Sequence, residues 1–445
     1  MSDTIRNIAL FGAVFILIIY SGFNQGWNNA MLIFNMGLIS AIMALGVNLQ
    51  WGFAGLFNVG IMGFVALGGL ATVLIGMPPT PGAWPAGGSG VVAALLMGAG
   101  TIIAAVILMK EMRKGVARNV AVLCLLVAGF FVFRSLLDPS VAAIESINPA
   151  QTGFLGGLNP GTPENYKQNG WVMLIAWPVG GLLAAGAAWL IGKTALGLRS
   201  DYLAIATLGI AEIIIAIMKN EDWLTRGVKN VVGVPRPVPY EIDLQSSASF
   251  VERAAGFGLD PVEGSTLYVK FLYMLLFAAV LLILIWLSHR ALHSPWGRML
   301  RAIRDNEVAA EAMGKDVTAR HLQVFILGSA ICGIAGAMMT TLDSQLTPGT
   351  YQPLRFTFLI WVMVIVGGSG NNWGAILGGF LIWYLWVQVE PMGLWLMNLI
   401  TSGMAEGSAL KEHLIDSAAH MRLMTMGLVL ILVLRFSPRG LIPEK

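Results

Sequence analysis

Long apolar runs separated by short polar stretches extend along the whole chain. About 20 apolar residues let an α-helix cross the ~30 Å hydrocarbon core of a bilayer. Twelve runs of this kind predict membrane-spanning helices: 8–23, 31–49, 55–76, 91–109, 119–137, 171–192, 202–218, 267–288, 322–341, 356–369, 374–390 and 423–435. The pattern therefore predicts an all-α, polytopic integral membrane protein with about 12 transmembrane helices.

Composition agrees with this pattern and excludes other classes. The chain has 445 residues, of which 56% are hydrophobic and 11% are charged, whereas a soluble domain averages about 25% charged residues. No room remains for a sizeable soluble domain, so we expect residues 1–445 to form a single transmembrane domain. The net charge of +3 gives no indication of nucleic-acid binding.

Basic residues gather in four polar segments, 110–118, 193–200, 289–321 and 435–445. With twelve crossings and a cytoplasmic N-terminus, all four segments lie in the cytoplasm, as the positive-inside rule requires. We therefore expect a multi-pass protein of a bacterial inner membrane with both termini in the cytoplasm. The segments expected outside are 77–90, 138–170, 219–266, 342–355 and 391–422, with 219–266 as a large periplasmic loop.

Segment 289–321 lies between two long apolar runs and is strongly charged. The pattern predicts a surface helix near 299–313, with an apolar edge formed by Leu300, Ile303, Val308 and Ala312. One interpretation is an amphipathic helix that lies on anionic lipid. Its acidic residues oppose lipid phosphate, so alternating charge favours a protein partner.

Two glycine-rich reversals each join a pair of apolar runs, at 51–60 and 367–374. Both lie on the same predicted side of the membrane, which is compatible with a parallel internal repeat. The alternative is two tight helical hairpins that need glycine for positive φ and close backbone approach.

Glu212 lies midway along an apolar run, where a charge is costly. Such a carboxylate must be neutral, be paired or face a wet cavity. It therefore either lines a translocation path or makes a structural hydrogen bond to a neighbouring helix. Thr207 is five residues away and does not share a helix face with it cleanly.

Several motifs for catalysis or cofactor binding fail on spacing. Gly192-Lys193-Thr194 suggests a phosphate loop, but five residues instead of four separate it from Gly186. His289 and His293 lack an acid at metalloprotease spacing. The two cysteines, Cys124 and Cys332, lie inside apolar runs and are expected to be small packing residues. We expect no enzyme activity, no cofactor and no metal site.

Five stretches together resemble one family, the inner-membrane permeases of branched-chain amino-acid ABC importers, of the LivM type. The resemblance extends over about two-thirds of the chain. The stretches are GVNLQWGFAG with NVG at 46–60, LRSDYLAIATLG with EII at 198–214, 297–337 from GRMLRAIRDNEVAAEAMG to GIAGA, VGGSG at 366–370 and SPRGL at 437–441.

The resemblance implies a permease subunit that pairs with a LivH-like permease, two cytoplasmic ABC ATPases and a periplasmic substrate-binding protein. Segment 289–321 is then the coupling segment, and Glu311 with Gly314 matches the Glu-Ala…Gly core of a coupling helix. The residues expected to couple to the ATPase are Arg301, Arg304, Glu307, Ala310, Glu311, Ala312 and Gly314. The candidates for the translocation path are Glu212, Thr207, Asn48, Asn58, Gly60, Gly367 and Gly368.

The chain departs from the family pattern at three places. Segment 77–170 is longer than the resemblance implies and is expected to add a loop and a helical hairpin. Ile61 and Leu359 replace a polar residue and a glutamate that many relatives carry. The expected substrate is a branched-chain or related amino acid. Urea or an amide remains an alternative, and so does an ion-coupled secondary transporter that works alone.

Overall fold

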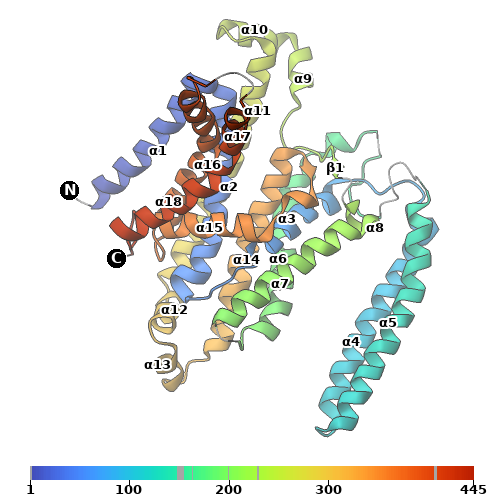
Figure 1. Cartoon of the computed structure of the whole chain (residues 1–445). Coiled ribbons are helices and arrows are strands. Elements are labelled where there is room, and N and C mark those ends of the chain that lie inside the picture. Colours follow the sequence, from blue (N-terminus) through green and yellow to red (C-terminus); the bar gives the residue numbers. More distant parts are fainter. Residues whose placement is uncertain are drawn as a thin grey trace.

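The computed structural model describes residues 3–147, 155–162, 164–198, 200–227, 230–404 and 408–444, and helices dominate this part of the chain (Figure 1). Each of the twelve apolar runs lies on a helix. These helices are α1 (Asp3–Gln25), α2 (Trp27–Val47), α3 (Ile61–Gly76), α4 (Ser89–Glu111), α5 (Val116–Glu145), α6 (Val172–Ala195), α7 (Ser200–Asn220), α11 (Pro261–Leu292), α14 (Val317–Asp343), α15 (Pro353–Gly367), α16 (Asn372–Ile400) and α18 (Met421–Phe436). The predicted all-α membrane fold is confirmed.

Shorter elements occupy the connections between these helices. They are η1 (Asn48–Gly52), η2 (Trp84–Gly88), η3 (Tyr166–Asn169), α8 (Asp222–Thr225), β1 (Val231–Val232), α9 (Glu241–Ser246), α10 (Ala248–Gly256), α12 (Pro295–Asp305), α13 (Glu307–Ala312), β2 (Gln345–Leu346), η5 (Pro348–Thr350), α17 (Ala409–Asp416) and η6 (Ser417–His420). The two strands pair antiparallel, with Val231 opposite Leu346. This pairing ties the long 219–266 loop to the turn that follows α14.

The number of helices that can cross a membrane unaided is smaller than predicted. Nine helices in the described residues are long and apolar enough, and a tenth appears if the bent pair α17 and α18 counts as one span. α3 and α15 have 16 and 15 residues, and about 24 Å of helix is shorter than the hydrocarbon core. Both are largely buried, and each adjoins a glycine-rich reversal.

Two predicted boundaries are wrong. The run expected at 55–76 becomes helical only at Ile61, because residues 55–60 belong to the first reversal. The run expected at 374–390 continues as α16 to Ile400, past Pro391, since a membrane helix tolerates proline when neighbours satisfy the freed backbone groups.

Basic turns of the chain and the α9–α10 part of the 219–266 loop lie at opposite ends of the molecule. In Figure 1 the α4–α5 turn and α13 are at the lower end, whereas α9 and α10 are at the upper end. The turn between α6 and α7 shares a cavity with Arg304 and Glu307, which places it beside α12 and α13. Arg199 and Lys445, which contribute to the basic pattern, lie outside the described residues.

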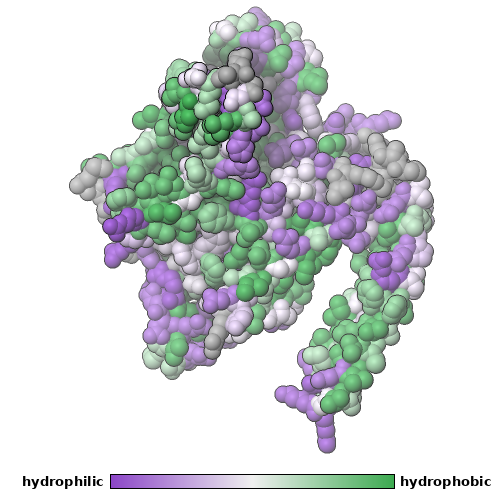
Figure 2. Space-filling view, in the orientation of Figure 1, coloured by the Kyte–Doolittle hydropathy of each residue, from purple (hydrophilic) through white to green (hydrophobic). Residues whose placement is uncertain are grey.

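The helices α4 and α5 form a hairpin that stands apart from the main bundle (Figure 1). Its shaft is hydrophobic and its free tip is hydrophilic in the space-filling view (Figure 2). Cys124 lies exposed on this hairpin, while Cys332 is buried in the bundle. The expectation that both cysteines are packing residues is therefore wrong for Cys124, since α5 packs chiefly on α4 and leaves most of its other surface free.

Small residues bring α3, α6 and α14 together at the centre of the bundle. A Cβ added at Gly333 would lie 2.5 Å from the carbonyl oxygen of Gly180. A Cβ at Gly336 would overlap the backbone of Val65, and one at Gly68 would overlap the backbone of Gly333. Helices in lipid associate by such close backbone packing, because the hydrophobic effect no longer drives them together.

Gly336→Val is expected to destabilise the protein by about 1–3 kcal/mol or more, because α14 must move away from α3. The matched control is Gly186→Val on α6, where an added Cβ meets no atom within 4 Å. Thermal unfolding in detergent should show a melting temperature lower by more than about 5 °C for the first variant only. Equal melting temperatures would contradict the close packing of α3 and α14.

Candidate functional site

The charged segment between α11 and α14 forms two helices, α12 and α13, instead of the single helix predicted near 299–313. Asn306 separates them with an extended backbone, φ −157° and ψ 96°. Its Oδ1 accepts a hydrogen bond from the Ala309 N–H at 2.9 Å, which is the geometry of an N-cap. The break changes the direction of the segment and resets its helical phase.

Two of the four residues predicted to form the apolar edge of this segment are therefore correct. Leu300 and Ile303 are buried, but Val308 is 76% exposed and Ala312 is exposed. Ala310 is buried in their place and packs with Ile303. Of the residues expected to meet an ATPase, Ala310 is thus an internal contact, whereas Glu307, Glu311, Ala312 and Gly314 are exposed on α13 and the turn after it.

Arg304, on α12, points into the protein. Its Nη1 donates to the carbonyl oxygen of Gly52 at 2.6 Å and to Oε2 of Glu444 at 2.7 Å. Its Nε and Nη2 donate to Oδ1 of Asp305 at 3.1 and 3.0 Å. Burial alone would lower the pKa of this guanidinium, but hydrogen bonding and attraction from the two carboxylates outweigh burial and raise the pKa. Arg304 thus joins α12 to the first reversal and to the end of the chain.

The two glycine-rich reversals meet beside Arg304. Asn48 is fully buried. Its Oδ1 accepts from the Gly370 N–H at 2.8 Å, and its Nδ2 donates to Oδ1 of Asn372 at 3.1 Å. Segments 51–60 and 367–374 therefore lie on the same side of the protein, as the sequence predicted.

Residues 441–444 close over the second reversal. The N–H groups of Leu441 and Ile442 donate to the carbonyl oxygens of Val366 and Gly367, both at 2.9 Å. Gly368 has φ +125°, and an added Cβ would overlap the backbone of Ile442. We call the assembly of Arg304, the two reversals and residues 441–444 the junction.

Asn58 and Gly60 support the first reversal from the side of α3 and α7. Asn58 donates to Oε1 of Gln50 and accepts from the Gly60 N–H, both at 2.9 Å. Gln50 in turn donates to Ser329 on α14 at 3.1 Å. Sequence reasoning did not single out Gln50 and Ser329, although a buried amide within an apolar run was a usable signal.

Thr207 and Glu212 take different places on α7. The Thr207 hydroxyl is buried and accepts from the Val59 N–H at 3.1 Å. An added Cβ at Gly60 would overlap the Thr207 carbonyl. Glu212 is instead exposed on the outer side of α7, next to the exposed Ile213. Asn58, Gly60, Gly367 and Gly368 therefore belong to the two reversals. Asn48 and Thr207 bind the reversals, and Glu212 is separate from them.

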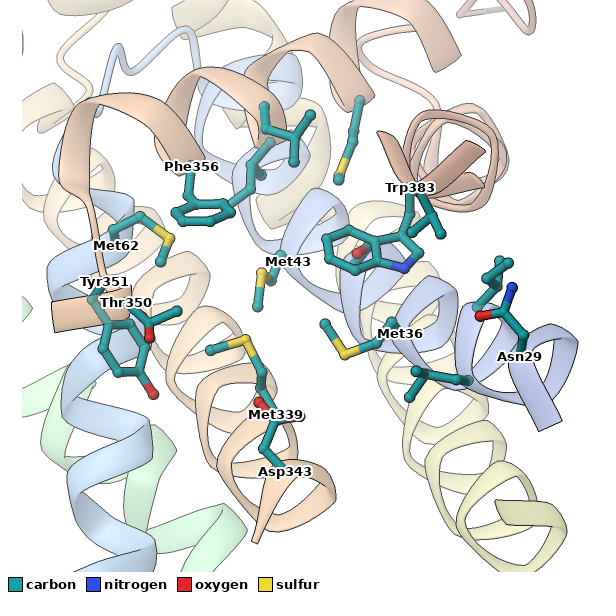
Figure 3. A pocket seen from close by; sticks show the side chains of 17 residues that line it. Asn29, Met36, Met43, Met62, Met339, Asp343, Thr350, Tyr351, Phe356 and Trp383 are labelled. Atoms are coloured by element: carbon teal, nitrogen blue, oxygen red, sulfur yellow. The ribbon is translucent and has the colours of Figure 1, made fainter. Parts of the chain in front are cut away.

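A cavity of about 320 Å³ opens between α2, α3, α14, α15 and α16 (Figure 3). Its wall is mostly apolar and holds five methionines, Met36, Met43, Met62, Met339 and Met363. Polar groups that also line it include Asn29, Asp343 and Thr350. None of the seven residues predicted for the path lines this cavity. The spacing of Met36 and Met43, two helical turns apart on one face of α2, was a signal that sequence reasoning missed.

The cavity adjoins the junction through the helices that form its wall. Phe356, Leu359, Ile360 and Met363 belong to α15, which ends at the second reversal. Trp383 and Val387 belong to α16, which begins there. A displacement of the second reversal would therefore move two walls of the cavity. The described residues contain no group of three or more histidine, cysteine, aspartate or glutamate side chains arranged to hold a metal ion.

Comparisons with known proteins give a match to one family model. The model of the family described as "Branched-chain amino acid transport system / permease component" matches residues 154–434. Its match begins after the α4–α5 hairpin. No solved structure matches the chain.

Three curated relatives are similar over parts of their length. The high-affinity branched-chain amino acid transport system permease protein LivM of Escherichia coli is 31% identical over 46% of this chain and 48% of its own. A probable LivM of Methanocaldococcus jannaschii is 28% identical over 56% of this chain and 61% of its own. A probable LivH of the same organism is 28% identical over 41% of this chain and 50% of its own. The chain thus spans about half the length of the curated relatives it matches.

Proposed function

The chain belongs to the family of branched-chain amino acid transport permease components, and we propose on that premise that it is the membrane-spanning subunit of an ATP-driven importer. Its substrates would be branched-chain or related amino acids. The observation that carries this proposal is the junction, which connects an exposed, charged segment to the helices around an apolar cavity. ATP hydrolysis would take place on partner chains.

The partners follow from the same premise. A second permease subunit, similar to LivH, would complete the translocation path, and the likeness of this chain to a LivH protein supports related folds for the two. Two cytoplasmic ATPases would contact α13, where the carboxylates of Glu307 and Glu311 are exposed. A periplasmic substrate-binding protein would deliver the substrate to the opposite end of the molecule, near α9 and α10. Both termini would then be cytoplasmic.

In this mechanism, closure of the ATPases displaces α12 and α13 together. Arg304 transmits the displacement, because it binds Gly52 in the first reversal and Glu444 beside the second reversal. α15 and α16 then move at their junction ends and change the width of the cavity. Asn48, Asn58, Gly60, Gly367, Gly368 and Thr207 act by holding the reversals in register, and they do not need to contact the substrate.

The cavity itself suits an amino acid with an apolar side chain. Methionine side chains are flexible and polarisable, and they adapt to branched aliphatic groups of different shape. Polar groups on the wall, including Asn29 and Asp343, offer partners for the charged end of the substrate. Glu212 lies outside the cavity. Because an exposed carboxylate within a membrane span is costly in lipid, we assign it to contact with the second permease subunit.

Co-purification tests the class of protein and the docking surface together. We expect the complex isolated in mild detergent to contain an ATPase, and we expect Glu311→Lys to reduce the bound ATPase at least tenfold. Glu252→Lys on α10 is the matched control, since that residue is also exposed and lies at the opposite end. Full retention of the ATPase by Glu311→Lys would remove α13 from the docking surface. Uptake by this chain alone, driven by an ion gradient in liposomes, would favour a secondary transporter instead.

A further inference from the structure

A second cavity lies on the outside of the bundle, where α11 meets α12 and the second reversal. It has a volume of about 570 Å³. Leu282 and Trp286 on α11 and Trp373 at the start of α16 contribute exposed apolar surface to its wall. His289, His293 and Arg301 contribute nitrogen donors. We call this cavity the α11 groove.

The apolar and polar groups of the α11 groove are separated along α11. Leu282 and Trp286 precede His289 and His293 by about two turns, so the groove passes from an apolar to a polar surface near the end of a membrane span. Tryptophan is typical of this boundary, because its ring is amphipathic. The groove therefore crosses the level at which acyl chains give way to headgroups.

Polar side chains in the α11 groove remain available to bind an anion. The imidazole rings of His289 and His293 have their centroids 3.9 Å apart, and Nδ1 of His293 donates to the carbonyl oxygen of His289 at 2.8 Å. Arg301 forms no ion pair within the part of the chain that the structure describes. Among the groove-lining residues that the structure describes, one carries a carboxylate, Glu444, which is already paired with Arg304 at 2.7 Å. An incoming phosphate would thus meet the unpaired guanidinium of Arg301, with the remaining imidazole nitrogens of His289 and His293 beside it.

We propose that the α11 groove binds an anionic phospholipid. One acyl chain lies along Leu282, Trp286 and Trp373, and the phosphate is held by Arg301 with His289 and His293. A protein partner would fit less well, because the apolar wall continues along a row of exposed apolar side chains on α11, including Leu275 and Ile283. The proposal requires only that α11 spans the membrane, and it does not depend on the transported substrate.

The α11 groove lies beside the junction, so a bound lipid would affect transport. Glu444 and Asn371 line the same groove, and both belong to the junction. The Asn371 Nδ2 donates to the carbonyl oxygen of Pro443 at 3.1 Å. A lipid phosphate on Arg301 would stabilise α12 against the second reversal. This consequence rests on the proposed function, and it predicts that anionic lipid raises the uptake of substrate.

The test is native mass spectrometry of the complete complex after mild delipidation. Phosphatidylglycerol and phosphatidylcholine are titrated onto the wild type and onto a variant with Arg301→Gln, His289→Gln and His293→Gln. We expect this variant to bind phosphatidylglycerol at least tenfold more weakly and to bind phosphatidylcholine as the wild type does. The matched control is Arg298→Gln, because Arg298 is exposed on the same helix but does not line the groove.

Four results would overturn the proposal. The first is equal phosphatidylglycerol binding by the wild type and the triple variant, and the second is a loss of binding in Arg298→Gln as large as in the triple variant. The third is equal affinity of the wild type for both lipids. The fourth is cross-linking of Trp286→Cys to another subunit instead of to lipid. Displacement of the lipid by inorganic phosphate alone would show that the site recognises a free anion and would also contradict the acyl-chain assignment. Binding is measured without uptake, so a failure of the transport assignment would leave the lipid result readable.

Discussion

Arg304→Gln is expected to reduce substrate uptake per ATP hydrolysed by roughly 5- to 150-fold, which corresponds to loss of a coupling free energy of about 1–3 kcal/mol. Glutamine cannot keep the bonds to Gly52 and Glu444 at once, so α12 moves without displacing the reversals. The Arg304 and Glu444 side chains are 23% and 28% exposed. A largely buried pair that loses one partner is destabilised far more than an exposed one. Uptake and ATP hydrolysis are measured together in proteoliposomes that hold the complete complex.

Two further variants separate coupling from simple loss of charge. Asp305→Asn removes the other carboxylate from the same guanidinium, but that side chain is 67% exposed, so uptake per ATP should change little. Glu444→Gln keeps the Gly52 bond and should give an intermediate loss. If Arg304→Gln transports as much substrate per ATP as Asp305→Asn, the junction does not carry the movement.

The helices of this chain are predictable because the positions of apolar runs along the sequence indicate where helices form in lipid. A run of apolar residues must be helical in a membrane, since each backbone group needs an internal partner. The rule fails for the count of spans at α3 and α15, because glycine-rich loops shorten these two helices. It also gives no warning of the break at Asn306, although asparagine followed by a short helix is a recognisable N-cap signal.

The site was harder to predict, because its parts are distant in sequence. Asn48 bonds with a residue 322 positions away, and Arg304 with one 140 positions away. The cost of a charge in an apolar run singled out Glu212, whereas the family resemblance supplied Asn48 and Asn58. Whether each lines a path or holds a turn depends on the neighbouring helix, which a single sequence does not specify. For the same reason, the sequence showed that a charge at Glu212 is costly in lipid, but it did not show that this side chain is exposed on the outer side of α7.

The methionine cavity escaped prediction for a different reason. Methionine within an apolar run is compatible with an ordinary core, and its spacing on one helix says nothing about the facing helices. Only the approach of α2, α14 and α15 leaves a space between Met36, Met43 and Met339. A cavity is a property of packing between helices, so the pattern along one chain carries little information about it.

Met339→Trp therefore tests directly whether the substrate passes through the methionine cavity. The larger ring would fill much of a cavity of about 320 Å³ and should lower uptake of leucine at least tenfold. Met339 is only half-buried, so the ring enters open space and the cost in stability stays near the lower end of the ~1–3 kcal/mol typical of overpacking. Uptake is measured in the complete complex, with ATPase retention as the check that assembly survives.

Met339→Leu is the matched control, because a volume-conserving swap leaves the cavity open and should leave uptake within about twofold of the wild type. A smaller residue provides the opposite test: Met339→Ala widens the same wall and should favour aromatic over branched-chain substrates. Unchanged leucine uptake in Met339→Trp, with the ATPase still bound, would exclude the cavity from the path. The path would then run along a surface shared with the second subunit, where Glu212 is exposed.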